Sequence, residues 1–102
     1  MVTVALQGEQ GKPRPALIVQ SDVFGELSAV TVLPITATLL DTPLLRVQVE
    51  PTQQNGLVKR SQIMVDKPQT PPRGKLGEVI GHLEDAAMLQ VNRALAVFLG
   101  LA

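Results

Sequence analysis

The alternation of apolar and polar residues predicts that most of the chain forms short β-strands. Residues 2–6 alternate valine or leucine with smaller or polar side chains, which indicates a first strand. Residues 16–20 begin with consecutive apolar positions, which is typical of a strand that is buried on both faces and central in its sheet. Residues 30–35 are rich in β-branched side chains and predict a third strand, and Pro34 near its end indicates an edge or a bulge.

The clearest alternation in the chain lies in residues 45–50 and predicts an antiparallel strand that is buried on one face. We expect its inward side chains to be Leu45, Val47 and Val49. Asn55 and Gly56 mark a turn, after which residues 57–65 predict a further strand interrupted by polar residues. A short extended piece is expected around residues 79–83.

The period of the pattern changes to that of a helix at Glu84. One face of this helix collects apolar residues, which we expect to pack on the core: Ala87, Met88, Val91, Ala94, Leu95 and Phe98. Glu84 and Asp85 suit the positive end of the helix dipole, and Gly100 stands where a C-terminal cap belongs. Several short strands followed by a helix at about 84–99 predict a single, mainly β domain over residues 1–102, built as a small, strongly curved β-barrel or half-barrel.

Composition narrows the classes of protein to which this domain can belong. The chain has 102 residues, of which 45% are hydrophobic, so it can form one modest core. It contains no cysteine and a single histidine, so disulfides and thiolate metal sites are excluded, and we expect no metal and no cofactor. No apolar run approaches the roughly 20 residues of a membrane span, and residues 1–6 lack the basic start of a signal peptide. We therefore expect a cytoplasmic protein that has no membrane partner.

The charges balance overall but are unevenly placed along the chain. Nine basic and nine acidic residues give a formal net charge of zero, which argues against a protein that coats long nucleic acid through a broad basic surface. Most of the basic residues nevertheless fall in loop-like segments: Lys12, Arg14, Lys59, Arg60, Lys67, Arg73 and Lys75. If these loops converge, a neutral protein acquires one local positive site.

The first candidate for chemistry is Arg14, which stands between two prolines after a Gly-rich loop. Proline fixes its own φ and disfavours the helical region in the residue before it, so Arg14 is held in extended backbone. Its guanidinium then presents a planar fork of donors that suits a phosphate or a carboxylate. The alternative is an ordinary turn in which the arginine pairs with a nearby acid.

Two further segments carry hydrogen-bonding side chains near strand ends. Thr36 ends the third predicted strand, where its hydroxyl can either face a groove or cap the following turn. In Lys59-Arg60-Ser61-Gln62, two cations precede two polar side chains. This segment could grip phosphate and a base edge, or it could be an edge strand that its charges keep from aggregating.

Taken in this order, the three segments resemble the MazF/PemK family of toxin endoribonucleases, the sequence-specific mRNA interferases of type II toxin–antitoxin systems. The resemblance covers nearly the whole chain. It rests on Glu9-Gln10-Gly11-Lys12-Pro13-Arg14-Pro15 with the apolar strand after it, on Leu33-Pro34-Ile35-Thr36, on the strand containing Ser61-Gln62-Ile63, and on the C-terminal helix.

The resemblance implies an SH3-like small β-barrel of the CcdB/MazF type that works as a homodimer. It also implies a metal-independent endoribonuclease that cleaves single-stranded RNA through attack of the 2′-OH, giving 2′,3′-cyclic phosphate and 5′-OH ends. A cognate antitoxin is expected to lay a peptide across the RNA groove and so inhibit cleavage.

By the same resemblance, Arg14 and Thr36 are the catalytic pair, because one can clamp the phosphoryl oxygens and the other can donate a hydrogen bond to them. Glu9 matches a functional loop glutamate of some members and could accept the 2′-hydroxyl proton. Gln62 matches a glutamine that lines the active groove. The other residues expected to bind RNA are Lys12, Lys59, Arg60, Ser61 and Phe24. Phe24 could stack a base, or it could instead anchor a surface turn.

The chain departs from the pattern of the family at three places. Ser61 stands where many members carry an acidic residue, and Pro13 stands where some carry a histidine. Which group acts as general acid or base is therefore left open. The usual lead-in to the first strand is missing, so either an edge of the barrel is trimmed or the natural start lies upstream.

Two non-catalytic alternatives keep the same fold. A CcdB-like gyrase poison would bind through the end of the C-terminal helix, but residues 96–102 lack the aromatic terminal residues that such binding would suggest. A degenerate homologue that only binds antitoxin would follow from the missing acid at Ser61. The sequence leaves open the RNA cleavage motif, the class of target RNA and the identity of the antitoxin.

Overall fold

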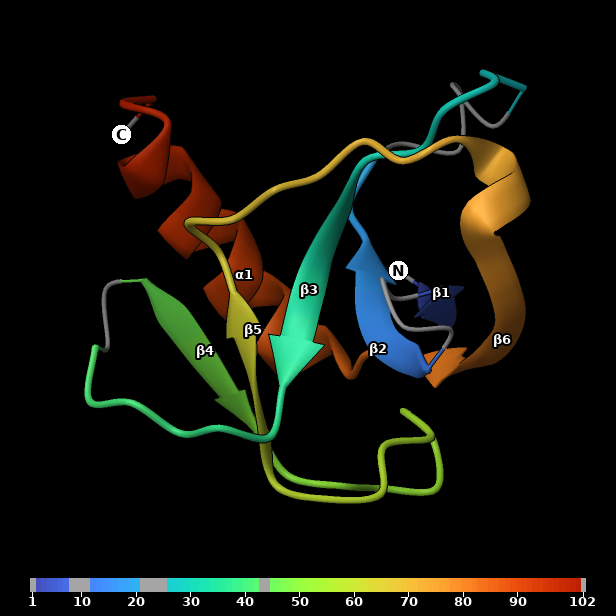
Figure 1. Ribbon diagram of the computed structural model, residues 1–102. Helices are drawn as coiled ribbons and strands as arrows, with labels where there is room; N and C mark the ends of the chain where they lie inside the picture. The colour runs from blue at the N-terminus through green and yellow to red at the C-terminus, as the bar shows by residue number, and fades with distance from the viewer. Residues whose placement is uncertain (1, 8–11, 21–25, 43–44, 102) are drawn as a thin grey trace.

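The computed structural model describes residues 2–7, 12–20, 26–42 and 45–101. Its elements follow one another as β1 (Val2–Gln7), β2 (Pro13–Ile18), β3 (Val32–Thr36), β4 (Arg46–Val49), β5 (Ser61–Met64), the 3₁₀ turn η2 (Arg73–Lys75), β6 (Leu76–His82) and α1 (Asp85–Phe98). The strands form one antiparallel sheet in the order β4-β5-β3-β2-β1-β6, and α1 packs beside β4 (Figure 1). The mainly β fold with a C-terminal helix is therefore confirmed.

The sheet is curled but does not close into a continuous barrel, because no ladder joins β4 to β6 among the described residues. The expected SH3-like barrel is in this respect corrected. The loop between β4 and β5 fills the gap instead. The His82 N–H donates to the Gln54 carbonyl at 2.8 Å, and the Thr3 hydroxyl donates to the Asn55 carbonyl at 2.9 Å. These contacts fasten the loop across β1 and β6.

The loop approaches β6 so closely that glycine is required on both sides of the contact. A Cβ at Gly56 would collide with the Ile80 carbonyl oxygen, and a Cβ at Gly81 would collide with the Gln54 carbonyl oxygen. Gly56 also has a φ of 70°, in the left-handed region that favours glycine. The turn that the Asn55-Gly56 pair predicts is thus confirmed, and it also seals the curl of the sheet.

The core lies mainly between the sheet and α1, and aliphatic side chains fill it. Its fully buried members include Leu17, Leu33, Ile63, Val65 and Val91. Val47 and Val49 are buried as predicted, whereas Leu45 is 37% exposed, because β4 begins one residue later. On α1, Ala87, Met88, Ala94 and Leu95 pack against the core. Phe98 was expected in the same stripe but is 42% exposed, at the end of the helix that extends away from the sheet (Figure 1).

Pro34 was predicted to mark an edge or a bulge, but β3 is an interior strand of the sheet. Residues 32–34 of β3 pair with β2, and residues 35–36 pair with β5. Pro34 lies at the change of partner, where a residue without an N–H leaves no ladder donor unpaired. The prediction of an edge strand is therefore wrong.

The helix ends as the sequence predicts. The Leu101 N–H donates to the Ala96 carbonyl at 2.7 Å, and the Gly100 N–H donates to the Val97 carbonyl at 3.1 Å. With a φ of 75° at Gly100, this is a Schellman motif. None of the helices in the described ranges has the length and apolar character needed to cross a membrane.

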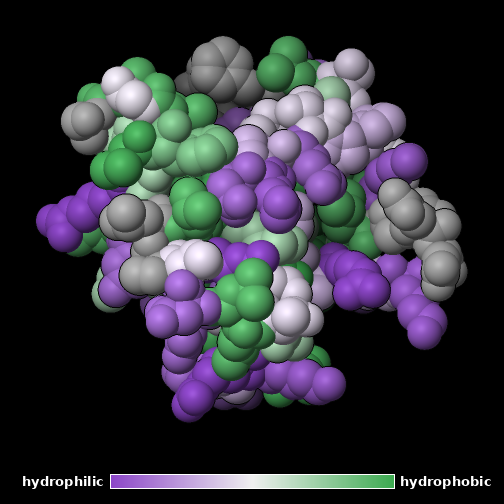
Figure 2. Space-filling view, turned by 60° about the vertical axis from the view of Figure 1, so that its left-hand side comes forward, coloured by the Kyte–Doolittle hydropathy of each residue, from purple (hydrophilic) through white to green (hydrophobic). Residues whose placement is uncertain are grey.

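Apolar side chains also reach the surface: Leu89 on α1 and Leu99 at its C-cap are 50% and 58% exposed. On the face shown in Figure 2, hydrophobic groups lie in separate patches among hydrophilic ones.

Candidate active site

Three cations from distant parts of the sequence meet at one pocket of about 470 Å³. Arg14 lies near the start of β2, Lys12 immediately precedes that strand, and Lys59 comes from the loop before β5. The remaining lining residues are Ala5, Pro13, Pro15, Ile35, Thr36, Ala37, Gly56, Leu57, Val58, Ser61 and Ile80. A protein with no net charge therefore presents a local positive site above a largely apolar wall.

Arg14 is exposed at this pocket and is held by the edge of a regular ladder. It pairs with Leu6 of β1, and the flanking Pro13 and Pro15 pair with the residues on either side of Leu6. No hydrogen bond or ion pair joins its guanidinium to any residue that the structure describes. Within that part of the chain, the alternative in which Arg14 pairs with an acid is not realised.

Thr36 lies in the same pocket, at the last position of β3. Its hydroxyl oxygen accepts the Thr38 N–H at 3.1 Å, so the residue does cap the following turn. This bond uses a lone pair and leaves the hydroxyl proton available to donate. The capping role and a role toward a bound anion are therefore compatible.

In the segment from Lys59 to Ser61, some side chains line the pocket and others lie outside it. Ser61 lines the pocket but is only 4% exposed, and its hydroxyl donates to the Lys59 carbonyl at 2.8 Å. Arg60 lies outside the set of pocket residues, and its Nε is 2.8 Å from a Glu50 carboxylate oxygen. Lys59 is thus the residue of this segment that brings a charge to the pocket.

Gln62 follows Ser61 in β5, so its side chain faces the other side of the sheet from Ser61, and the residue pairs with Thr36 of β3. Gln62 is 6% exposed, and both its amide oxygen and its amide nitrogen are hydrogen-bonded. It accepts the Leu40 N–H at 3.0 Å, donates to the Leu40 carbonyl at 2.8 Å, and lies 3.4 Å from the Arg46 guanidinium. The structure therefore does not bring Gln62 to the Arg14 pocket, and instead uses it to hold the loop that follows Thr36.

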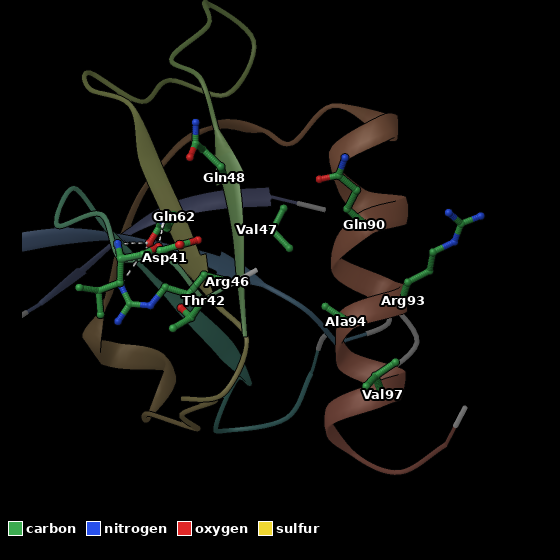
Figure 3. Close-up of a pocket in the computed structure, with 11 residues that line it drawn as sticks. Asp41, Thr42, Arg46, Val47, Gln48, Gln62, Gln90, Arg93, Ala94 and Val97 are labelled. Carbon is green, nitrogen blue, oxygen red and sulfur yellow. Dashed lines mark hydrogen bonds between the residues drawn. The ribbon is translucent and has the colours of Figure 1, made fainter. Parts of the chain in front are cut away.

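Gln62 lines a second pocket, of about 510 Å³, between β4 and α1. In Figure 3, Asp41, Arg46 and Gln62 gather on the β4 side, and Gln90, Ala94 and Val97 come from the helix, while Arg93 extends away from the strand. The Arg46 guanidinium is already engaged, because it donates to the Thr38 carbonyl at 3.1 Å. Neither Arg14 nor Thr36 is among the residues that line it.

Glu9 and Phe24, expected to act as proton acceptor and base-stacking residue, lie outside the residues that the structure describes. Two described residues have a place beside this pocket that the sequence did not predict. Asn55, which was predicted only to mark a turn, is completely buried and organises the loop beside the pocket, and Val58 lines the pocket although it is 89% exposed. The Asn-Gly pair signals the turn, but nothing in the local sequence signals the distant partners of Asn55.

Comparison with known proteins agrees with this architecture. Residues 1–99 match the family described as PemK-like, MazF-like toxin of type II toxin–antitoxin systems. The chain is 46% identical over 101 residues to the probable endoribonuclease MazF of Mycolicibacterium smegmatis, covering 98% of this chain and 93% of that protein. It is 29% identical over 94 residues to endoribonuclease EndoA of Bacillus subtilis, covering 91% and 81% of the two chains.

Solved structures give the same result. Mycobacterium tuberculosis toxin MazF-mt6 superposes with a TM-score of 0.86 at 31% identity, covering 100% of this chain and 99% of that one. An endoribonuclease from a mycobacterial species, solved in complex with its cognate antitoxin, has a TM-score of 0.82 at 26% identity and covers 98% and 93%. The fold is thus that of a small toxin. The chain belongs to the PemK-like, MazF-like toxin family of type II toxin–antitoxin systems.

Proposed function

We propose that this toxin is a metal-independent endoribonuclease that cleaves single-stranded RNA in the pocket of Arg14 and Thr36. The observation that carries the proposal is the position of Arg14, which is exposed, has no hydrogen-bond or ion-pair partner among the described residues, and shares one pocket with Thr36 and two lysines. Relatives named as endoribonucleases support it. A planar guanidinium beside a hydroxyl donor suits a phosphoryl group that gains charge during reaction.

The reaction needs no nucleophile from the protein, because RNA supplies its own. The 2′-oxygen forms a bond to phosphorus while the bond from phosphorus to the 5′-oxygen breaks. The products are a 2′,3′-cyclic phosphate and a 5′-hydroxyl, so one proton leaves the 2′-hydroxyl and one is delivered to the 5′-oxygen. Arg14 would stabilise the charge on the nonbridging oxygens, Thr36 would donate to one of them, and Glu9 would take the 2′-proton.

An antitoxin that covers this pocket would stop the reaction. Related toxins have been solved with their antitoxins, and we propose that this chain, as a homodimer, binds a cognate antitoxin in the same way. Lys12, Arg14 and Lys59 offer an acidic peptide a landing site. Antitoxin and RNA should therefore compete, and simultaneous binding of both to one pocket would contradict this part of the proposal.

Cleavage of a long single-stranded RNA in EDTA, with analysis of the fragment ends, tests the proposal. Wild type should give discrete fragments ending in cyclic phosphate, and Arg14→Ala should cut roughly 10²–10³-fold more slowly, as expected from the loss of one transition-state donor. Arg93→Ala is the matched control, because Arg93 is exposed beside the other pocket. A folded Arg14→Ala protein that cuts like wild type would refute the proposal. Absence of cutting by wild type would favour the non-catalytic alternatives.

A further inference from the structure

Val58 is the most exposed of the large hydrophobic residues in the described chain, at 89%, and it lines the Arg14 pocket. An isolated valine on a surface needs no explanation in itself. This one differs because it lines a charged pocket whose wall is otherwise largely apolar. It also lies immediately before Lys59, which faces the same pocket.

The main chain on both sides of Val58 is firmly held. Leu57 is 8% exposed and belongs to the core, and its N–H donates to the Asn55 side chain at 3.0 Å. On the other side, the Lys59 carbonyl accepts the Ser61 hydroxyl at 2.8 Å. Arg60 is tied to Glu50 at 2.8 Å. Val58 is therefore an exposed side chain on an anchored segment.

The lining of the pocket indicates what such a side chain would contact. Beside the cations, Ala5, Pro13, Pro15 and Ile80 form an apolar wall. RNA-binding proteins normally stack bases on aromatic rings, but the one aromatic residue within the described ranges, Phe98, lies on α1 and not in this pocket. A β-branched side chain has few rotamers. It therefore offers a base a stiff apolar surface at little cost in side-chain entropy.

We propose that Val58 is a specificity-determining residue: the nucleobase next to the phosphate held by Arg14 packs against Val58, which thereby selects the base accepted at that position. This inference rests on the proposed endoribonuclease function. In this proposal, the cations bind the phosphate of a nucleotide and Val58 contacts the base beside that phosphate. Both chemistries meet in the single pocket that Arg14 and Val58 share.

The test compares Val58→Ala, Val58→Thr and Val58→Ile with wild type on a pool of RNA randomised around the preferred cleavage site. Sequencing of the cut ends gives the base preference at every flanking position, and kcat and KM are measured on the preferred sequence. We expect Val58→Ala to lower kcat/KM by about 10-fold, the scale of a lost apolar contact. The preference should flatten at one flanking position, and Val58→Ile should retain it.

Val79→Thr is the matched control, because Val79 is 62% exposed on β6 and does not line the pocket. It should leave rate and preference unchanged. Unchanged preferences at all positions in Val58→Ala and Val58→Thr, with cleavage still dependent on Arg14, would overturn this inference alone. RNA that wild type does not cut, or that Arg14→Ala cuts equally well, would overturn the proposed function and the inference with it.

Discussion

The Asn55 side-chain amide donates to the Glu84 carboxylate at 2.9 Å and so joins the loop beside the pocket to the N-cap of α1. The same amide group also donates to the Glu50 carbonyl at 2.9 Å, and its oxygen accepts the N–H groups of Thr52 and Leu57, each at 3.0 Å. The buried amide therefore has a partner for every donor and holds the loop in one conformation. One of these partners, Leu57, is itself a lining residue of the Arg14 pocket and is followed by two more, Val58 and Lys59.

Replacement of Asn55 should unfold the loop more readily than any change to its exposed neighbours. Asn55→Ala leaves buried main-chain donors without an acceptor, so we expect the free energy of unfolding to fall by about 3 kcal/mol. Gln53→Ala, at an exposed position of the same turn, should change it by no more than about 0.5 kcal/mol. Urea denaturation measures both. Equal effects of the two substitutions would show that the Asn55 network does not stabilise the loop.

Alanine substitutions at three glycines should distinguish the stability cost of a strained backbone from the cost of a steric collision. Gly100→Ala forces a left-handed φ in open space and should cost about 1 kcal/mol. Gly56→Ala adds a collision with the Ile80 carbonyl and should cost at least about 3 kcal/mol. Gly74→Ala meets neither problem and should stay within about 0.5 kcal/mol of wild type. Thermal unfolding ranks the three variants, and a Gly56→Ala protein as stable as Gly100→Ala would contradict the tight contact with β6.

Removal of the Thr36 hydroxyl should slow cleavage without a comparable loss of RNA affinity. Thr36→Val keeps the shape of the side chain but deletes the donor, and we expect kcat to fall roughly 10²-fold. Thr36→Ser retains the hydroxyl and should stay within about 10-fold of wild type. Single-turnover kinetics with the two variants decides the role. A serine variant as slow as the valine variant would point to packing rather than hydrogen bonding.

The two cations next to each other at 59 and 60 should contribute differently to RNA binding. Lys59 faces the pocket, so Lys59→Ala should weaken binding and lower the slope of log K against log salt by roughly one. Arg60 is paired with Glu50 at an exposed site, so Arg60→Ala should have the smaller effect. The coupling energy between Arg60 and Glu50 should not exceed about 1 kcal/mol. Salt titrations of RNA binding test the first two expectations, and a double-mutant cycle on the free energy of unfolding tests the coupling energy.

Much of the fold follows from local pattern, and the exceptions have physical reasons. Period-two alternation places Val47 and Val49 in the core, and a glycine at the right distance from the helix predicts the cap at Gly100. Leu45 escapes the pattern because the chain is still turning there, with its N–H bonded to the Thr42 carbonyl at 3.0 Å. The position of Pro34 inside the sheet depends on pairing with two distant strands, which a local pattern does not reveal.

In the candidate site, too, some features follow from local sequence and others depend on distant residues. Arg14 and Thr36 each lie in a short segment that carries its own signal, and the fold brings both to one pocket. Ser61 and Gln62 were assigned to one groove, but only Ser61 lines the Arg14 pocket, because the Gln62 amide is hydrogen-bonded to the main chain of Leu40. The role of Asn55 could not be predicted locally, because its partners Glu84 and Thr3 lie 29 and 52 positions away.

The change of partner at Pro34 has a consequence for how the pocket assembles. Arg14 belongs to the ladder of β1 and β2, whereas Thr36 pairs with Gln62 in the ladder of β3 and β5. The two residues therefore come from opposite sides of a seam in the sheet. In the proposed mechanism both groups contact one phosphate, so we expect cleavage to require both ladders, and a chain in which only one of them has formed should be inactive on RNA.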